Sequence, residues 1–120
     1  MRIIGAHSII FSTNPDADRV FLRDGLHLPN IDAGDGWLIF GLPPAEVTVH
    51  PHKRNNVHKF YLLTDDIEVF IQEMARLEVD YEPVVEAEWG SLTNITLPGG
   101  GKLGVYQPRH ARPTDLAALI

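Results

Sequence analysis

The sequence predicts an α+β fold made of two βαβββ modules that are related by an internal pseudo-twofold axis. The chain of 120 residues has the size of a single domain. Segments with the composition of strands flank two segments with helical periodicity. Landmarks of the first half recur in the second half in the same order, which indicates an internal repeat with eight strands and two helices in total.

The first half begins with a strand-like segment, residues 2–13, that is rich in Ile and Phe. A helix is expected over residues 15–24, because Asn14 is a favourable N-cap and Gly25 a favourable stop. Turn residues then separate three further strand-like segments. These segments are residues 28–33, 37–42 and 46–50.

The same order of elements restarts after a polar loop. Asp65 is expected to begin the second helix, and Glu68 three residues later completes a pair that resembles a capping box. An apolar stripe at helical spacing supports this helix. The stripe consists of Ile67, Phe70, Ile71, Met74 and Leu77. The strand-like segments of this half are residues 57–64, 79–85, 89–97 and 102–107.

Matched residues at nearly constant spacing carry the argument for a duplication. The pairs are His7 with His58 and Thr13 with Thr64, 51 positions apart, and Trp37 with Trp89, 52 positions apart. The modules therefore span about residues 2–50 and 57–107 of one domain at 1–108. Residues 109–120 are left as a C-terminal tail.

Composition excludes several classes of function. The net charge is −6, so the basic footprint of a nucleic-acid-binding protein is missing. The absence of cysteine excludes disulfides, Cys-ligated zinc and thiol catalysis. No apolar run approaches the ~20 residues of a membrane span. We therefore expect a cytoplasmic protein with neither nucleic acid nor membrane as a partner.

The repeated pattern, with a histidine in the first strand of each half, resembles the vicinal oxygen chelate superfamily. Its members include glyoxalase I, extradiol dioxygenases, fosfomycin resistance enzymes and bleomycin-binding resistance proteins. The resemblance covers about residues 2–108, and its most specific segments are GAHSIIFST, FLRDGLHLP, GWLIFGLPP, HKFYLLTDDI and LPGGGKLGVYQP. It implies eight mixed strands curled around a cavity, two helices outside, and a homodimer.

The resemblance also implies where a divalent metal, such as Fe, Mn, Ni or Zn, would bind. In the enzymes the ligands come from the first and last strands of each module. The first-strand places hold His7 and His58, but the last-strand places hold Thr48 and Gly104, so both carboxylates are missing. Two imidazoles alone make a weak site. The residues that could complete it from the strand face of Thr48 are Glu46 and His50.

Four aromatic side chains fall in the segments that would line the cavity, although such residues also serve as core. They are Trp37, Tyr61, Trp89 and Tyr106. The favoured function is the binding of a small organic molecule without a complete metal site and with no certain cofactor. The alternative is a metal-dependent lyase, isomerase or dioxygenase that uses His7 and His58. A third reading is an interaction module whose cavity is filled by its own side chains. The remaining loop histidines, His27, His52 and His110, are expected to be solvated.

Overall fold

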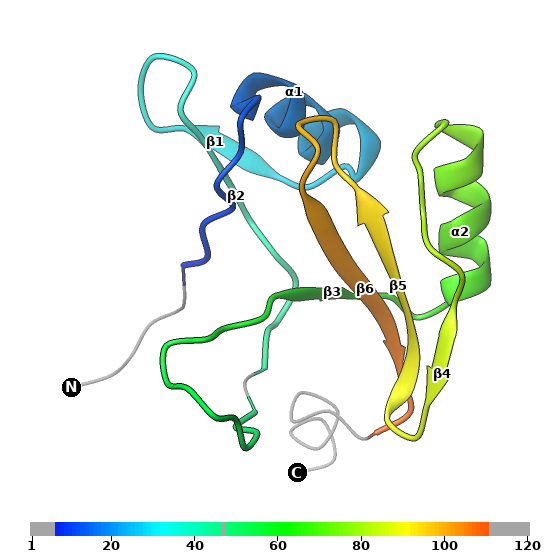
Figure 1. Cartoon of the computed structure of the whole chain (residues 1–120). Coiled ribbons are helices and arrows are strands. Elements are labelled where there is room, and N and C mark those ends of the chain that lie inside the picture. The colour runs from blue at the N-terminus through cyan, green and yellow to red at the C-terminus, as the bar shows by residue number, and fades with distance from the viewer. Residues whose placement is uncertain (1–6, 47, 111–120) are drawn as a thin grey trace, which may run out of the picture.

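The computed structural model describes residues 7–46 and 48–110 of the chain (Figure 1). Within these residues it has two helical segments and six strands in two sheets, which confirms the predicted α+β class. The elements are α1 (Pro15–Val20), the π-helical turn η1 (Phe21–Gly25), β1 (Asn30–Asp32), β2 (Leu38–Phe40), β3 (Tyr61–Leu63), α2 (Ile67–Arg76), β4 (Val85–Ala87), β5 (Gly90–Thr96) and β6 (Lys102–Pro108). None of the helices described is long and apolar enough to cross a membrane.

The larger sheet has the strand order β3-β6-β5-β4. β3 runs parallel to β6, and the other neighbours are antiparallel. The longest ladder joins β5 to β6, from Gly90 opposite Pro108 to Thr96 opposite Lys102. The turn between these two strands uses Gly100, whose φ of 97° is a conformation that side chains rarely adopt. β1 and β2 form a separate antiparallel pair.

Helix α2 covers one face of this sheet (Figure 1). Its N-cap is Asp66, whose Oδ1 accepts hydrogen bonds from the backbone N–H groups of Glu68 and Val69 at 3.1 Å each. The expectation that Asp65 caps this helix is wrong by one residue. The side chain of Gln107 in β6 accepts a further bond from the N–H of Ile67 at 2.9 Å, so the sheet itself helps to cap the helix.

The hydrophobic core lies between α2 and the sheet, because alternate residues of β5 and β6 point toward the helix. Met74 of α2 is 1% exposed within this core. Phe21 reaches the same cluster from η1, so the first helical segment packs on the same core as α2. The cluster consists of Phe21, Met74, Ile95, Leu97 and Leu103.

A polar contact joins the two halves of the chain at the turn between β5 and β6. The Thr13 hydroxyl donates to the carbonyl of Gly99 at 3.1 Å, and the N–H of Gly99 donates to Asp18 Oδ1 at 2.7 Å. Asp18 is only 6% exposed. A Cβ at position 99 would lie 2.9 Å from Asp18 Oδ2 and nearer still to the Ser12 hydroxyl, so a larger residue here would displace these side chains.

Two of the eight expected strands do not form in the described part of the chain, and the strand expected at residues 79–85 shares only Val85 with β4. Residues 7–13 and the described members of 46–50 belong to no strand, and residues 2–6 lie outside the described residues. A strand needs a neighbour that satisfies its backbone groups, and these segments pair with no described strand. Their apolar side chains are correspondingly exposed: Phe11 is 89% and Val49 93% exposed. Eight strands and two equivalent modules therefore stay predictions.

Candidate functional site

The sheet face opposite α2 carries a cluster of three aromatic side chains: Tyr61, Trp89 and Tyr106. We call these three residues the aromatic cluster. The Tyr106 ring lies in the middle, with its centroid 5.5 Å from that of Tyr61 and 5.0 Å from that of Trp89. The interplanar angles are 85° and 88°, which is the edge-to-face arrangement that aromatic rings favour. Side chains alternate along β6, so Tyr106 points away from the core that holds Val105.

This arrangement depends on a glycine beneath the Tyr61 ring. Gly104 is the register partner of Tyr61 across β3 and β6. A Cβ at position 104 would lie 2.7 Å from Cε1 of Tyr61 and 3.3 Å from the Asn94 amide oxygen. The ring therefore occupies the space into which a longer side chain would project. Gly104 is one of the two last-strand places at which the resemblance leads us to expect a metal-binding carboxylate.

The aromatic cluster ends in a group of polar atoms. His110 Nε2 lies 3.3 Å from the Tyr106 hydroxyl oxygen and 3.8 Å from Oε2 of Glu46. The side chains of His110 and Glu46 are 34% and 22% exposed. We call Glu46, His110 and the Tyr106 hydroxyl the polar end of the site. His110 was expected to be solvated, but it contacts Tyr106 and Glu46. In the sequence, the one signal for these contacts is the position of His110 just after the last expected strand.

The backbone next to His110 is held by its neighbour, Arg109. The Arg109 N–H donates to the carbonyl of Trp89 at 2.9 Å. Its guanidinium pairs with the Glu86 carboxylate and donates to the Ser91 hydroxyl at 3.1 Å. The Ser91 hydroxyl in turn donates to Glu86 at 2.6 Å. Hydrogen bonds from Ser91 and Arg109 lower the pKa of Glu86 below its ordinary value of 4.5. Sequence reasoning missed this network, whose members come from three segments.

The residues predicted to hold a metal do not come together as a ligand set. His7, His50 and His58 are exposed. In the part of the chain that the structure describes, no three His, Asp or Glu side chains are placed to hold a metal ion. Glu46 contacts His110 instead. At Gly104, the Tyr61 ring occupies the space into which a longer side chain would project.

Trp37 is placed apart from the aromatic cluster. It precedes β2 in the smaller sheet and is 65% exposed. The guanidinium of Arg19 lies 4.9 Å from the centroid of its ring, which is a cation–π distance. The structure thus brings together three of the four aromatic residues that were expected to line a cavity.

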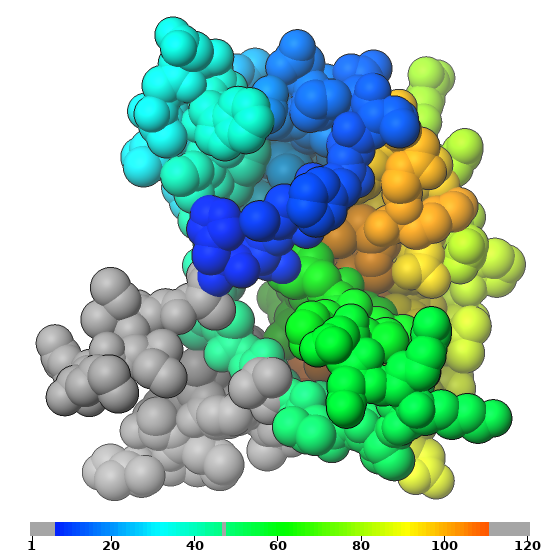
Figure 2. Space-filling view, turned by 60° about the vertical axis from the view of Figure 1, so that its left-hand side comes forward, coloured from blue at the N-terminus to red at the C-terminus, as the bar shows by residue number. Residues whose placement is uncertain are grey.

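The surface is hollowed between the dark-blue N-terminal segment and the green residues that precede β3 (Figure 2).

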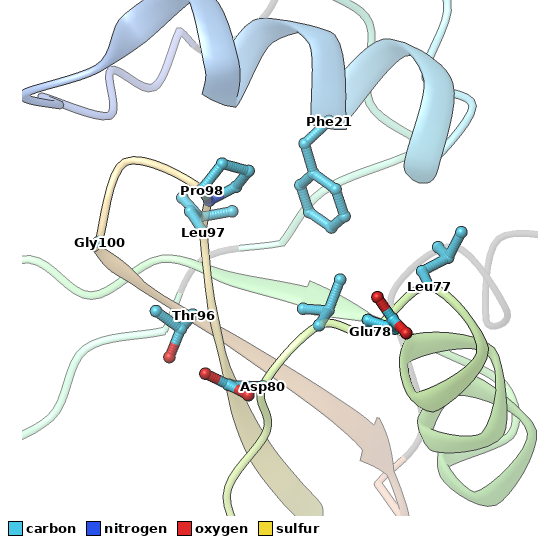
Figure 3. Close-up of a pocket in the computed structure, with 9 residues that line it drawn as sticks. Phe21, Leu77, Glu78, Asp80, Thr96, Leu97, Pro98 and Gly100 are labelled. Atoms are coloured by element: carbon cyan, nitrogen blue, oxygen red, sulfur yellow. The ribbon is translucent and has the colours of Figure 1, made fainter.

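A second hollow of about 490 Å³ lies among η1, the end of α2 and the turn between β5 and β6 (Figure 3). It is lined by Phe21, Leu77, Glu78, Val79, Asp80, Thr96, Leu97, Pro98 and Gly100. None of the site residues predicted from the sequence lines it. Its floor belongs to the hydrophobic core, and the charged groups among its described lining residues are the carboxylates of Glu78 and Asp80.

Comparison with known proteins adds information about the fold. No protein-family model and no curated protein sequence matches this chain. Several solved structures do match it. A lactoylglutathione lyase from Agrobacterium tumefaciens is 16% identical, with a TM-score of 0.64 over 89% of this chain and 96% of that one. TnmS3, an antibiotic binding protein from Streptomyces sp. CB03234, is 18% identical, with a TM-score of 0.62 over 89% and 99%. The fosfomycin resistance protein FosX from Mesorhizobium loti is 12% identical, with a TM-score of 0.54 over 97% and 99%.

These proteins differ in what their names say they do, and their sequence identities to this chain are low. Structural similarity at this level of identity shows a shared architecture. The activity has to be inferred from the residues of the site. The alignments cover nearly the whole of both chains, so the architecture is shared over the full length of the domain. This chain shares the fold of these solved structures, in agreement with the fold that the resemblance of its sequence to the vicinal oxygen chelate superfamily implied.

Proposed function

We propose that the protein binds a small organic molecule against the aromatic cluster and does so without a complete catalytic metal site. The observation that carries this proposal is the Tyr61 ring above Gly104. The Tyr61 ring fills the space above Gly104, the position at which the resemblance implies a metal-binding carboxylate in the enzymes. TnmS3, which is described as an antibiotic binding protein, is an example of binding by this fold.

Physical properties of the cluster support a ligand with an aromatic or apolar body. Stacked or edge-to-face rings contribute about 0.5–1.5 kcal/mol beyond the area that they bury. Trp89 remains 42% exposed, so part of its indole is open to contact. The net charge of −6 favours a neutral or cationic ligand over an anionic one.

Fluorescence of Trp89 tests this proposal. The chain has two tryptophans, so a Trp37→Phe variant reports only from the aromatic cluster. We expect a panel of neutral and cationic aromatic molecules to contain ligands that quench this variant. The matched variant Trp89→Phe, which reports from Trp37, should respond weakly to the same ligands. Equal quenching of both variants, or of neither, would contradict the proposal.

We also propose a homodimer. Ile9, Phe11 and Val49 expose large apolar areas on segments that were expected to be strands. A second copy could cover these side chains, and stable interfaces bury roughly 800 Å² on each partner. Sedimentation should therefore give a mass near twice 13.4 kDa at micromolar concentration. A species of 13.4 kDa at every concentration tested would contradict the dimer.

The alternative function is a metal-dependent lyase, isomerase or dioxygenase, and the matched positions of His7 and His58 favour it. These two histidines would hold the metal, with Glu46 or His50 as a further ligand. The metal would supply a Lewis acid for vicinal oxygens. Calorimetric titration with Fe(II), Mn(II), Ni(II) and Zn(II) tests this alternative. It predicts micromolar binding that a His7→Ala/His58→Ala double variant loses and a His27→Ala/His52→Ala double variant keeps.

A further inference from the structure

We propose that the second hollow, the one among η1, the end of α2 and the turn between β5 and β6, is a binding site for amphipathic cations. Such molecules have a compact apolar body and a protonated amine. The hollow shares no lining residue with the aromatic cluster, so this site is independent of the function proposed above. Its apolar lining and the carboxylates of Glu78 and Asp80 carry the proposal (Figure 3).

The hollow offers an apolar surface that a hydrocarbon body can cover. Phe21 and Leu97 belong to the core cluster and are 9% and 2% exposed. Leu77, Val79 and Pro98 complete the apolar lining. The volume of about 490 Å³ falls within the range of roughly 300–1,000 Å³ that is typical of small-molecule sites. Burial of hydrocarbon against this lining removes apolar area from water, which favours binding.

Two carboxylates give the hollow its negative charge. Glu78 and Asp80 are two positions apart, and neither carboxylate forms a hydrogen bond or an ion pair within the described residues. The Lys102 ammonium lies 2.8 Å from the hydroxyl of Thr96, another lining residue, but its carboxylate partner is Glu82, at 3.8 Å. An amine cation in the hollow would therefore meet negative charge that no described lysine or arginine neutralises.

The conformation of Glu78 indicates that the stability of α2 does not favour a glutamate here. Glu78 follows the C-cap Leu77 and has a φ of 58°, in the left-handed region that favours glycine. Its N–H donates to the carbonyl of Ala75 at 3.1 Å, and the N–H of Val79 donates to that of Met74 at 2.9 Å. This is the helix ending in which glycine is the usual residue. A carboxylate is also unfavourable at the negative end of the helix dipole. A residue that breaks two local rules is expected where function requires it.

The hollow is built from both halves of the chain. Phe21 reaches it from η1, whereas the two carboxylates come from the segment that follows α2, on the opposite side of the hollow in Figure 3. A bound molecule that covers the Phe21 ring would hold η1 against the second half. The amides of η1 should therefore exchange with solvent hydrogen more slowly when the site is occupied.

NMR titration with 1-adamantylammonium tests the proposal, because this probe has a compact aliphatic body and one positive charge. 1-Adamantanol is the matched neutral probe. We expect the ammonium to shift the amide signals of Val79, Thr96 and Gly100, and to bind about threefold to fivefold more tightly than the alcohol. This ratio is roughly the effect of one partly solvated ion pair. The indole N–H of Trp89 should not move, which separates this site from the aromatic cluster.

Two variants of the carboxylates follow. Glu78→Gln/Asp80→Asn removes both charges with little change of shape, so the ammonium should then bind no more tightly than the alcohol. Asp65→Asn/Glu88→Gln is the matched control, because it makes the same change of net charge at exposed residues outside the hollow, and it should keep the preference. Glu78→Gly should raise the urea midpoint of unfolding and weaken ammonium binding, so that stability and affinity move in opposite directions.

Three results would overturn the inference. They are the absence of shifts at these amides with millimolar probe, equal affinity of the wild type for the ammonium and the alcohol, and a preference that survives in Glu78→Gln/Asp80→Asn. Each of these results leaves the proposed binding of aromatic molecules standing, because that proposal is tested at Trp89. Failure of the Trp89 test would in turn leave this site standing.

Discussion

Replacing Gly104 by alanine is the sharpest test of the aromatic cluster, because it adds one methyl group beneath the Tyr61 ring. The new Cβ would lie 2.7 Å from Cε1 of Tyr61 and 3.3 Å from Oδ1 of Asn94. The first separation is far shorter than the 3.5–4.0 Å at which carbon atoms attract one another, and the second is tighter than an ordinary van der Waals contact. Tyr61 must turn away from Tyr106, or β3 must move away from β6.

The magnitude follows from two opposing effects. Insertion of a methyl group into a packed region costs about 1–3 kcal/mol through displaced side chains and backbone. Alanine in a strand recovers about 0.5–1 kcal/mol relative to glycine, because it loses less conformational entropy on folding. The free energy of unfolding should therefore fall by roughly 0–2.5 kcal/mol.

Urea unfolding followed by circular dichroism measures this change. Gly101→Ala is the matched control, since a Cβ at position 101 meets no atom within 4 Å, and it should be neutral or slightly stabilising. In a Tyr61→Ala background the collision is absent, so Gly104→Ala should be neutral or slightly stabilising. The double-mutant cycle should thus give a coupling of about 1 kcal/mol or more. Additive effects of the two changes would refute the packing of the ring on the glycine.

Three further predictions concern the framework of the site. Asp66→Ala should destabilise the protein by about 0.5–2 kcal/mol through loss of the α2 cap, whereas Asp65→Ala should have little effect, both measured by urea unfolding. Met74→Ala should cost about 2–5 kcal/mol by the same measurement, because the side chain is 1% exposed in the core. The pKa of Glu86 is lower in the folded state, so this carboxylate stabilises the fold above its ordinary pKa of 4.5, and the contribution is lost as the pH falls below that value. The stability difference between wild type and Glu86→Gln, measured by urea unfolding, should therefore shrink on acidification below about pH 4.5.

Much of the fold could be predicted from local patterns in the sequence. The expected helix at residues 15–24 corresponds to α1 and η1, and the stripe that includes Ile67 and Met74 identified α2. The two strands at 89–97 and 102–107 correspond closely to β5 and β6. These elements combine strong periodicity with glycine or capping signals at their ends, which is where sequence reasoning is strongest.

Less of the candidate site could be predicted, because its contacts join distant segments. Sequence reasoning selected Tyr61, Trp89 and Tyr106 as cavity residues, and the structure brings these three together. It gave no role to His110, because nothing in the local sequence shows that Glu46 lies beside it. The lining of the cavity and the role of the predicted metal residues stay predictions.

The contacts at Gly99 have a consequence for how the chain folds. Gly99 bonds to residues 81 and 86 positions away in the sequence, whereas the turn between β5 and β6 closes within a few residues. Closing a long loop costs more chain entropy, so we expect the β5–β6 hairpin to form early and α1 to dock on it late. An element that docks late through few contacts can also open without global unfolding. The amides of α1 should then exchange with solvent hydrogen faster than those of β5, because α1 can detach while the sheet stays formed.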